Sequence, residues 1–317
     1  MSAIQPINRE AKWKKLGRVF CANGQNDLMH TGGRTPVPLH LGGDRYRLYF
    51  ASYDSAGRGR IFSLELDLAD PQRVENLVTE PIIDLGNVGY YDDNGIIPSW
   101  LVETDGKIFL YTIGFSIKNK LIFDAATGLA ISEDGGQSFR KLNGPVIDRG
   151  VDDPSFAASP CVIREGDVWR MWYVSCDHWV PDGDRHKHFY NIKHRSSRDG
   201  IYWDPKASVC IDYANEHEYA ISRPTVVRDS EGQYRMWYSF RASANVATYR
   251  IGYATSSDGL TWERKDALAG IDVSTEGWDS EMICYPCVFE HKGQLYMLYN
   301  GNGYGRSGFG LAVLETA

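Results

Sequence analysis

The sequence contains no apolar run close to the roughly twenty residues that a transmembrane helix needs, and its first fifteen residues lack the apolar centre of a signal peptide. It also has no excess of basic residues, because 34 Lys and Arg face 41 Asp and Glu, for a net charge of −7. A broad basic field that would hold nucleic acid or anionic lipid is therefore excluded. We expect a cytoplasmic protein with no membrane insertion and no nucleic-acid partner.

Cysteines are few, and none of the six forms a CxxC pair. Cys161 and Cys287 fall just after prolines on strands that we expect to be buried. This placement favours reduced core thiols over disulfides, in agreement with a cytoplasmic location.

Aromatic residues, by contrast, are abundant, with 9 Trp, 19 Tyr and 12 Phe. Such rings suit half-buried strand surfaces and also stack on sugars. Many of them belong to a pattern that occurs five times, about sixty residues apart: a proline opens an apolar strand, a tight turn follows, and a second strand ends in an aromatic. The prolines are Pro36, Pro98, Pro160, Pro224 and Pro286, and the aromatics are Phe50, Tyr111, Tyr173, Tyr238 and Tyr299.

Three of the repeats continue with a third strand and a Ser-x-Asp-Gly turn that leads to Phe139, Trp203 or Trp262 at the start of a fourth strand. Asp-Gly is a strong hairpin signal, so we interpret these turns as structural. A single hairpin cannot bury its own apolar face and needs its neighbours. Five repeats of four short strands therefore predict an all-β fold, a five-bladed β-propeller that forms a single domain over residues 1–317.

The fifth repeat has hairpin strands near residues 284–300 and a third strand at 308–314, but no fourth strand follows. The segment from Trp13 to Phe20 resembles the fourth-strand run that begins at Trp262. We expect this N-terminal segment to pair beside residues 308–314 and to complete the last blade, which would remove two open sheet edges.

The first strand of every propeller blade lines the central channel, and the loops that enter these strands form one mouth. Each of the five loops carries at least one carboxylate, together with His, Arg or Trp in some of them. One such acid would be an ordinary solvated residue, but five in equivalent places favour a functional pocket. The predicted substrate-binding residues are Asp27, His30, Arg34, Tyr91, Arg223, Trp278, Asp279, Glu281 and Arg306.

Two carboxylates across a pocket are what the cleavage of an acetal requires, one as acid and one as base or nucleophile. The predicted catalytic residues are Asp92 or Asp93 as base or nucleophile and Glu218 as acid, with Asp153 beside them. Arginines would hold a carboxylate or a phosphate of the substrate, or else act as counter-ions to the acids.

The proline-headed strands, the hairpin EGQYRMWYS at residues 231–239 and the S-x-D-G-x-x-W turns resemble the five-bladed propeller enzymes of glycoside hydrolase families 32, 43, 62, 68 and 130. The chain is also similar to propellers associated with the assembly of bacterial surface polysaccharides and to the propeller joined to some plant sphingolipid glycosyltransferases. In family-43-like enzymes an aspartate directly before the first inner-strand proline is the base. Here Thr35 has that place, and its counterparts are Ile97, Ser159, Arg223 and Tyr285. The catalytic trio of the resembled group therefore does not carry over.

Histidines are concentrated in the third repeat, between Cys176 and Arg195, where we expect a long loop that folds over the channel mouth. Four histidines and three aspartates there could hold a divalent metal, but their spacing defines no ligand set. They are His178, His186, His188, His194, Asp177, Asp182 and Asp184. We expect no metal and no cofactor.

The sequence thus predicts an enzyme that acts on a glycosidic bond of a small-molecule or oligosaccharide substrate, as a glycosidase, transglycosidase or phosphorylase. The alternative is a non-catalytic sugar-binding propeller that partners a glycosyltransferase.

Overall fold

The computed structural model describes residues 11–242 and 246–315, whose strands form three sheets of 4, 12 and 5 strands. Single parallel bridges, Ala126–Ala157 and Tyr190–Ala220, join three antiparallel groups within the largest sheet, so the strands can be described as five antiparallel groups. The first group contains β2 (Ala22–Asn23), β3 (Thr31–Gly42), β4 (Arg45–Tyr53), β5 (Gly59–Asp67) and β6 (Asp70–Ile83). The second contains β7 (Gly95–Thr104), β8 (Lys107–Ser116), β9 (Asp124–Ser132) and β10 (Arg140–Lys141). The third contains β11 (Phe156–Glu165), β12 (Val168–Asp182), β13 (Arg185–Ser197) and β14 (Ser208–Ile211). The fourth contains β15 (Glu218–Arg228), β16 (Tyr234–Ala242), β17 (Val246–Ser256) and β18 (Glu263–Arg264). The fifth contains β19 (Cys284–His291), β20 (Gln294–Asn300), β21 (Phe309–Glu315) and β1 (Lys12–Phe20).

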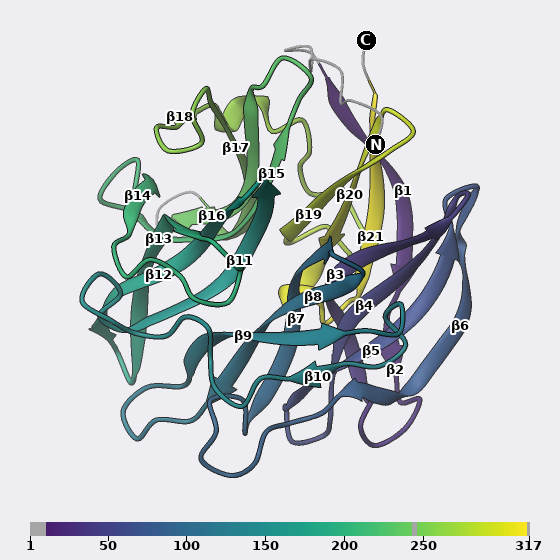
Figure 1. Ribbon diagram of the computed structural model, residues 1–317, viewed down its shortest axis with the longest axis horizontal. Coiled ribbons are helices and arrows are strands. Elements are labelled where there is room, and N and C mark those ends of the chain that lie inside the picture. The colour runs from purple at the N-terminus through teal and green to yellow at the C-terminus, as the bar shows by residue number, and fades with distance from the viewer. Residues whose placement is uncertain (1–10, 243–245, 316–317) are drawn as a thin grey trace.

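The groups follow one another around a common centre (Figure 1). The strand of each group that follows the entering loop is its inner strand: β3, β7, β11, β15 or β19. Each inner strand contacts the next, and β19 contacts β3, so the inner strands form a closed circuit. This nearly all-β architecture confirms the predicted class of fold.

The N-terminal strand completes the fifth group as expected. β1 pairs antiparallel with β21, with Trp13 opposite Leu314 and Arg18 opposite Gly310. The two strands lie side by side although they come from opposite ends of the described chain (Figure 1). The edges of β1 and β21 that face each other are therefore covered by backbone hydrogen bonds, and β1 is the outer strand of this sheet.

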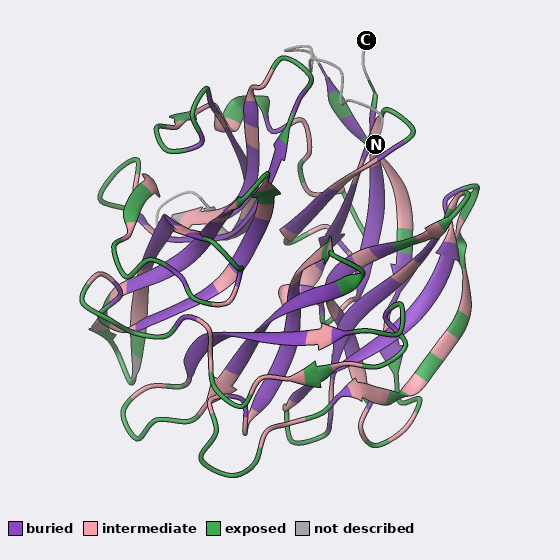
Figure 2. Ribbon diagram, in the orientation of Figure 1, coloured by how far each residue is buried: buried purple, intermediate pink, exposed green. Residues whose placement is uncertain are grey.

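The apolar core is divided into separate clusters. Five of the clusters among the described residues each combine side chains of two neighbouring groups, and one lies at the centre. Figure 2 shows this burial along the strands, whereas the turns and the outer strand β6 are exposed. Each group buries its two faces against its two neighbours. The closed circuit is therefore needed for every group to be packed on both faces.

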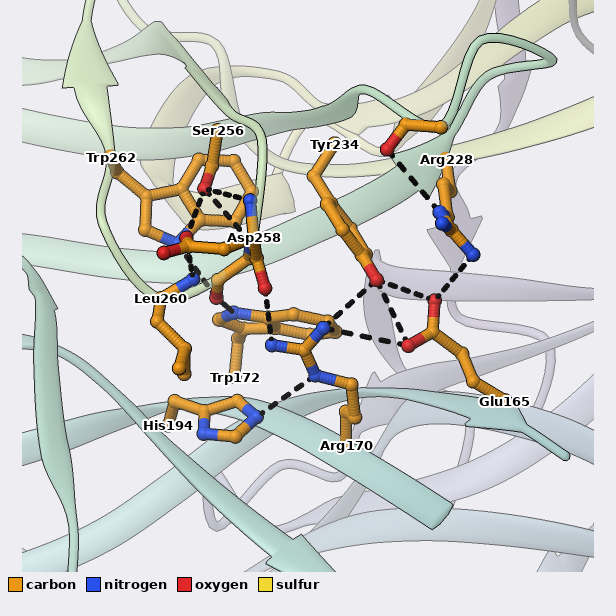
Figure 3. Close-up of polar contacts among 12 residues, drawn as sticks. Glu165, Arg170, Trp172, His194, Arg228, Tyr234, Ser256, Asp258, Leu260 and Trp262 are labelled. Atoms are coloured by element: carbon orange, nitrogen blue, oxygen red, sulfur yellow. Dashed lines mark hydrogen bonds and ion pairs between the residues drawn. The ribbon is translucent and has the colours of Figure 1, made fainter. Parts of the chain in front are cut away.

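The Ser-x-Asp-Gly turns have the structural role that the sequence predicts. The carbonyl of Gly259 accepts hydrogen bonds from the indole of Trp172 on the preceding group and from that of Trp262 (Figure 3). The equivalent carbonyls of Gly136 and Gly200 accept from the hydroxyls of Tyr49 and Tyr111. Each turn therefore fastens one group to the group before it.

Two short helices complete the described residues, the 3-10 helix η1 (Asp266–Leu268) and α1 (Asn302–Gly305). With three and four residues, neither could span a bilayer. All six cysteines lie in the described part of the chain and are free, and Cys161 and Cys287 are buried, as expected.

The expectation of a long loop between Cys176 and Arg195 is wrong. β12 and β13 continue as a paired hairpin as far as Asp182 opposite Arg185. The backbone groups of this segment are hydrogen-bonded between the two strands. The segment is therefore an extension of the third group and not a separate loop.

Candidate functional site

The residues directly before the five inner-strand prolines meet at the centre of the circuit. Thr35, Ser159, Arg223 and Tyr285 have φ angles of 51°, 55°, 48° and 58°, in the left-handed region. A break in the strand register accompanies each of them. Such backbone costs on the order of 1–3 kcal/mol per residue and concentrates at functional sites. The fold holds these four side chains in place at a cost in stability.

A cavity of about 300 Å³, here called the central pocket, lies over these residues. All five groups contribute to its wall. The wall includes every residue that directly precedes one of the five prolines: Thr35, Ile97, Ser159, Arg223 and Tyr285. Its volume is at the lower end of the range for ligand pockets, about 300–1,000 Å³. Polar and aromatic side chains from all five groups meet in this pocket, and it is the candidate site.

Aromatic rings form much of the wall of the central pocket. The rings of His188 and Tyr190 are stacked with centroids 4.7 Å apart and an interplanar angle of 4°. The hydroxyls of Tyr190 and Tyr249 share a hydrogen bond, and the ring of Tyr249 lies 5.6 Å from that of Tyr285 and 6.0 Å from that of Tyr304. Burial raises the pKa of both Tyr190 and Tyr249, so these phenols stay protonated. Faces and hydroxyls of this kind suit the stacking and hydrogen bonding of a sugar.

Two arginines, from the first and the fourth group, line the central pocket. The guanidinium of Arg34 lies 4.0 Å above the ring of Tyr53, and that of Arg241 donates to the hydroxyl of Tyr304 at 2.9 Å. The Nε atoms of both arginines are buried and have no hydrogen-bond partner. Among the described residues, neither arginine has an ion pair.

A third arginine forms the floor. Arg223 is 3% exposed, and its guanidinium donates to the carbonyls of Pro98 at 3.2 Å, Ser99 at 3.1 Å and Thr35 at 3.5 Å. Burial lowers its pKa. The hydrogen bonds of the Arg223 guanidinium thus go to main-chain carbonyls of the first and second groups. The expected contact between Arg223 and a ligand remains a prediction.

His188 is a neutral donor in this environment. Burial, helped by the positive charges of Arg241 and Lys187, lowers the pKa of His188 to about 3. The guanidinium of Arg241 can only donate, so Nε2 of His188, at 3.1 Å, must accept. The proton is therefore on Nδ1, which is buried and has no partner. The central pocket thus presents a further unused N–H group.

No carboxylate belongs to the described residues that line the central pocket. Asp92, predicted as base or nucleophile, is 1% exposed and accepts from Lys141 at 2.6 Å. Glu218, predicted as acid, accepts from both terminal nitrogens of Arg264 at 2.7 and 2.9 Å. Lys141 and Arg264 stand on the fourth strands of their own groups. Each pair ties the entering loop of a group to its outer strand.

Two further predicted acids are also ion-paired, Asp279 with a fourth strand and Asp153 with Arg195 on the third strand β13. Asp279 accepts from Lys15 on β1 at 2.7 Å, again a fourth strand, and from the hydroxyl of Tyr299 at 3.0 Å. Asp153 is fully buried, pairs with Arg195 and accepts from the hydroxyl of Tyr173 at 3.1 Å. The repeated acids are thus neutralised locally, and the geometry supports a role in positioning the loops.

Asp93 is different, because it lines a second cavity of about 330 Å³, here called the acidic side cavity. Tyr91, Asp124 and Asp148 line the same cavity. Ala125 belongs to the walls of both cavities, so the acidic side cavity adjoins the central pocket. Among the described residues that line the acidic side cavity, Asp93 is the only predicted catalytic acid.

The remaining predicted residues lie outside both walls. Asp27, His30, Glu281 and Arg306 are exposed, and the ring of Trp278 packs 5.3 Å from that of Tyr299. Their substrate contacts remain predictions.

The histidines of the third group are spread along its hairpin. The ring of His178 stacks on Phe189 with centroids 4.7 Å apart, and His194 accepts from Arg170 at 3.3 Å, as Figure 3 shows. The described residues contain no group of three or more metal ligands. The inner face of the hairpin carries His188 and Tyr190 into the wall of the central pocket.

Sequence reasoning missed Arg241, Tyr190, Tyr249 and Tyr304, and it named His188 only among possible metal ligands. One signal was present: Tyr190 and Tyr249 occupy equivalent positions in two repeats, each ahead of the Ser-x-Asp-Gly turn on the third strand. Arg241 and Tyr304 lie after the repeated hairpins, where the copies diverge, and only the folded circuit brings them together.

Comparisons with known proteins extend this description. No family model matches the chain. The uncharacterized proteins Rv1502 (strain ATCC 25618 / H37Rv) and MT1551 (strain CDC 1551 / Oshkosh) of Mycobacterium tuberculosis are each 42% identical over 304 residues, which cover 96% of this chain and 99% of the relative.

Solved structures share the fold at low identity. A thermostable family-43 glycoside hydrolase matches with a TM-score of 0.63 and 18% identity, over 92% of this chain and 90% of its own. The alpha-L-arabinofuranosidase PaAbf62A from Podospora anserina, in complex with cellotriose, matches with a TM-score of 0.67 and 9% identity, over 97% of both chains. An exo-1,5-alpha-L-arabinanase from a bovine ruminal metagenomic library has a TM-score of 0.60 and 16% identity, over 92% of this chain and 94% of its own. The expected likeness to propeller glycoside hydrolases is confirmed for the fold.

Proposed function

The chain belongs to the same family as Rv1502 and MT1551 of Mycobacterium tuberculosis, and we propose that this family member is a carbohydrate-active propeller. In this proposal the five strand groups are the blades of a five-bladed, single-domain propeller. A saccharide occupies the central pocket, and the protein acts on one of its glycosidic bonds. The likeness of the fold to glycoside hydrolases supports this proposal.

The observation that carries the proposal is the composition of the central pocket. Its wall combines stacked rings, among them His188 and Tyr190, with unused polar groups such as the N–H of His188 and the hydroxyl of Thr35. Pockets that bind small polar ligands combine an apolar and aromatic lining with a few placed polar groups. Sugars satisfy both at once, since their C–H faces stack on rings and their hydroxyls form hydrogen bonds.

The acidic side cavity supports a catalytic role. Cleavage of an acetal needs two carboxyl groups beside the bond, and Asp93, Asp124 and Asp148 line this one cavity next to the pocket. We assign the acid–base role to Asp93 with Asp148 as its partner, because Asp124 pairs with Lys118 and Arg149 in the way that excludes the other paired acids. Asp92, Asp153 and Glu218 act in this proposal through the loops that they position.

A glycan-array screen followed by turnover assays on the glycans that bind tests the proposal. Asp93→Asn should keep binding and lose a hundredfold or more of turnover, the order expected for loss of an acid or base. Asp167→Asn, which removes an exposed aspartate outside both cavities, is the matched control and should turn over normally. Full turnover by Asp93→Asn would contradict the assignment of Asp93.

A second function, non-catalytic sugar binding as the partner of a glycosyltransferase, is favoured by one observation. None of the described residues that line the central pocket is a carboxylate, whereas glycosidases place carboxylates beside the bond that they cleave. Glycans that bind to the parent protein without any turnover would favour this second function over the first.

A further inference from the structure

The charge of the central pocket is opposite to that of the chain. The chain has a net charge of −7, yet the pocket contains Arg34, Arg223 and Arg241 and, among its described lining residues, no acid. The repeated acids of the entering loops are instead bound to other cations, as in the pairs Asp92–Lys141 and Glu218–Arg264. A cationic pocket in an acidic protein is therefore a specific feature of this site.

Unpaired cations in such a place are costly. A charge removed from water destabilises the protein unless a counter-charge or hydrogen bonds compensate it. The Nε groups of Arg34 and Arg241 and the Nδ1–H group of His188 are all buried without partners. All three are donors, so the missing partner is a group rich in acceptors.

The described residues that line the pocket supply no anionic counter-charge. The tyrosines around Arg241 could neutralise it only as phenolates, but burial raises the pKa of Tyr190, Tyr249 and Tyr285. Cys284 lies within the field of all three arginines, and burial nevertheless raises its pKa, so the thiol is neutral as well. Ring faces compensate these charges in part, that of Tyr53 for Arg34 and those of Tyr219 and Tyr249 for Arg241. An anionic ligand would supply the negative charge that the rings lack.

We propose that the central pocket selects a saccharide that carries an oxyanion, either a carboxylate or a phosphate, and that Arg34 and Arg241 bind this group. The proposal rests on the carbohydrate function proposed above and narrows it to acidic sugars. A guanidinium presents parallel N–H groups that match both oxyanions, and bidentate binding adds specificity to charge. The N–H group of His188 adds a third donor, and Arg223 adds positive field from the floor.

Matched sugars test the proposal on the full-length protein. Isothermal titration measures the affinities for glucuronic acid, glucose 6-phosphate, glucose and inorganic phosphate, at low and at high ionic strength. We expect at least one acidic sugar to bind ten times or more as tightly as glucose, with an affinity that falls as salt increases. The two acidic sugars distinguish a carboxylate from a phosphate as the preferred group.

Variants locate the binding group. Arg34→Met and Arg241→Met should each weaken the binding of the acidic sugar tenfold or more and leave the binding of glucose within threefold. Arg34→Lys, which keeps the charge and loses the fork, should give an intermediate affinity. Arg198→Gln removes the same charge from an exposed turn outside the pocket and should bind as the parent does. Melting temperatures confirm that each variant is folded, and Arg34→Lys keeps the test valid if a methionine variant fails to fold.

The outcomes separate the two proposals. If glucose and the acidic sugars bind equally tightly, the selection of an oxyanion is overturned and the carbohydrate function stands. If inorganic phosphate binds and is lost with Arg34→Met while no sugar binds better than phosphate, the cationic pocket stands and the carbohydrate function is overturned. If no probe binds the parent protein, both proposals fail.

Discussion

Asp153→Asn is the substitution that best distinguishes a structural from a catalytic role of the loop acids. Asp153 is fully buried and pairs with Arg195, whose side chain is 9% exposed. Tyr173 connects the two, since its hydroxyl accepts from Nε of Arg195 at 2.9 Å and donates to the carboxylate. The substitution hardly changes volume but removes the only negative charge that pairs with Arg195 among the described residues.

The magnitude follows from this burial. Removing one partner of a buried ion pair costs about 3–5 kcal/mol, because it leaves the other charge uncompensated. An unfolding entropy of about 2.1 cal/mol/K per residue corresponds to roughly 0.7 kcal/mol/K for 317 residues. We therefore expect Tm to fall by about 4–8 °C.

Thermal and urea denaturation measure the loss, with Asp167→Asn as the exposed control. Adding Arg195→Met to Asp153→Asn removes the uncompensated charge and should restore more than half of the lost stability. A Tm for Asp153→Asn that cannot be distinguished from that of the parent protein would refute the structural interpretation of this pair.

Two further predictions concern the wall of the pocket and the closure of the circuit. His188 has a pKa of about 3 in the folded protein and 6.5 when exposed, so the unfolded chain binds more protons between these two pH values. The contribution of the neutral His188 to stability should be fully present above about pH 6.5. It should decrease as the pH falls toward 3, by about 2 kcal/mol at pH 5. His188→Gln should show a smaller loss of urea stability between pH 7 and pH 5 than the exposed control His186→Gln, and equal losses would contradict the assignment. Trp13 is 6% exposed on β1 and packs 5.5 Å from Trp237, so Trp13→Ala should cost about 3–5 kcal/mol in urea denaturation, whereas substitution of its exposed neighbour Lys12 should cost little. A Trp13→Ala variant as stable as the parent would show that β1 does not hold the fifth group together.

Much of the fold could be predicted because it repeats. Pro160, Pro224 and Pro286 precede the same turn and the same closing aromatic, and a strand period of two needs only local sequence to be recognised. The prolines themselves lie inside the inner strands and do not open them, because each strand begins earlier in the entering loop. The pairing of Trp13 with residues near 314 was predictable for the same reason, as the fifth repeat lacked a fourth strand. The hairpin beyond Cys176 was not, because its polar and His-rich composition resembles a loop and only the pairing of β12 with β13 makes it a strand.

The candidate site was harder to predict, because a sequence gives the charge of each residue but not the residues that its side chain contacts. Asp92 and Glu218 stand in the loops that should carry function, but the sequence does not show that Lys141 and Arg264, each more than forty residues away, bind them. Arg241 has an ordinary place after a repeated hairpin. Its significance comes from the absence of an ion-pair partner among the described residues, which only the folded arrangement defines.

The pairing of β1 with β21 has a consequence for how the molecule is assembled. Each of the first four groups is built from consecutive residues, so its strands can find one another soon after they are synthesised. The fifth group must join Trp13 to Leu314, across about three hundred positions of chain. Contacts at such separation form slowly, because the entropy of closing the intervening chain opposes them. The circuit therefore closes last, and until it does, β21 presents an open edge to which the N-terminal strand of a second molecule could add. Dilute refolding should favour closure within one chain, whereas crowded refolding should favour exchange of β1 between chains.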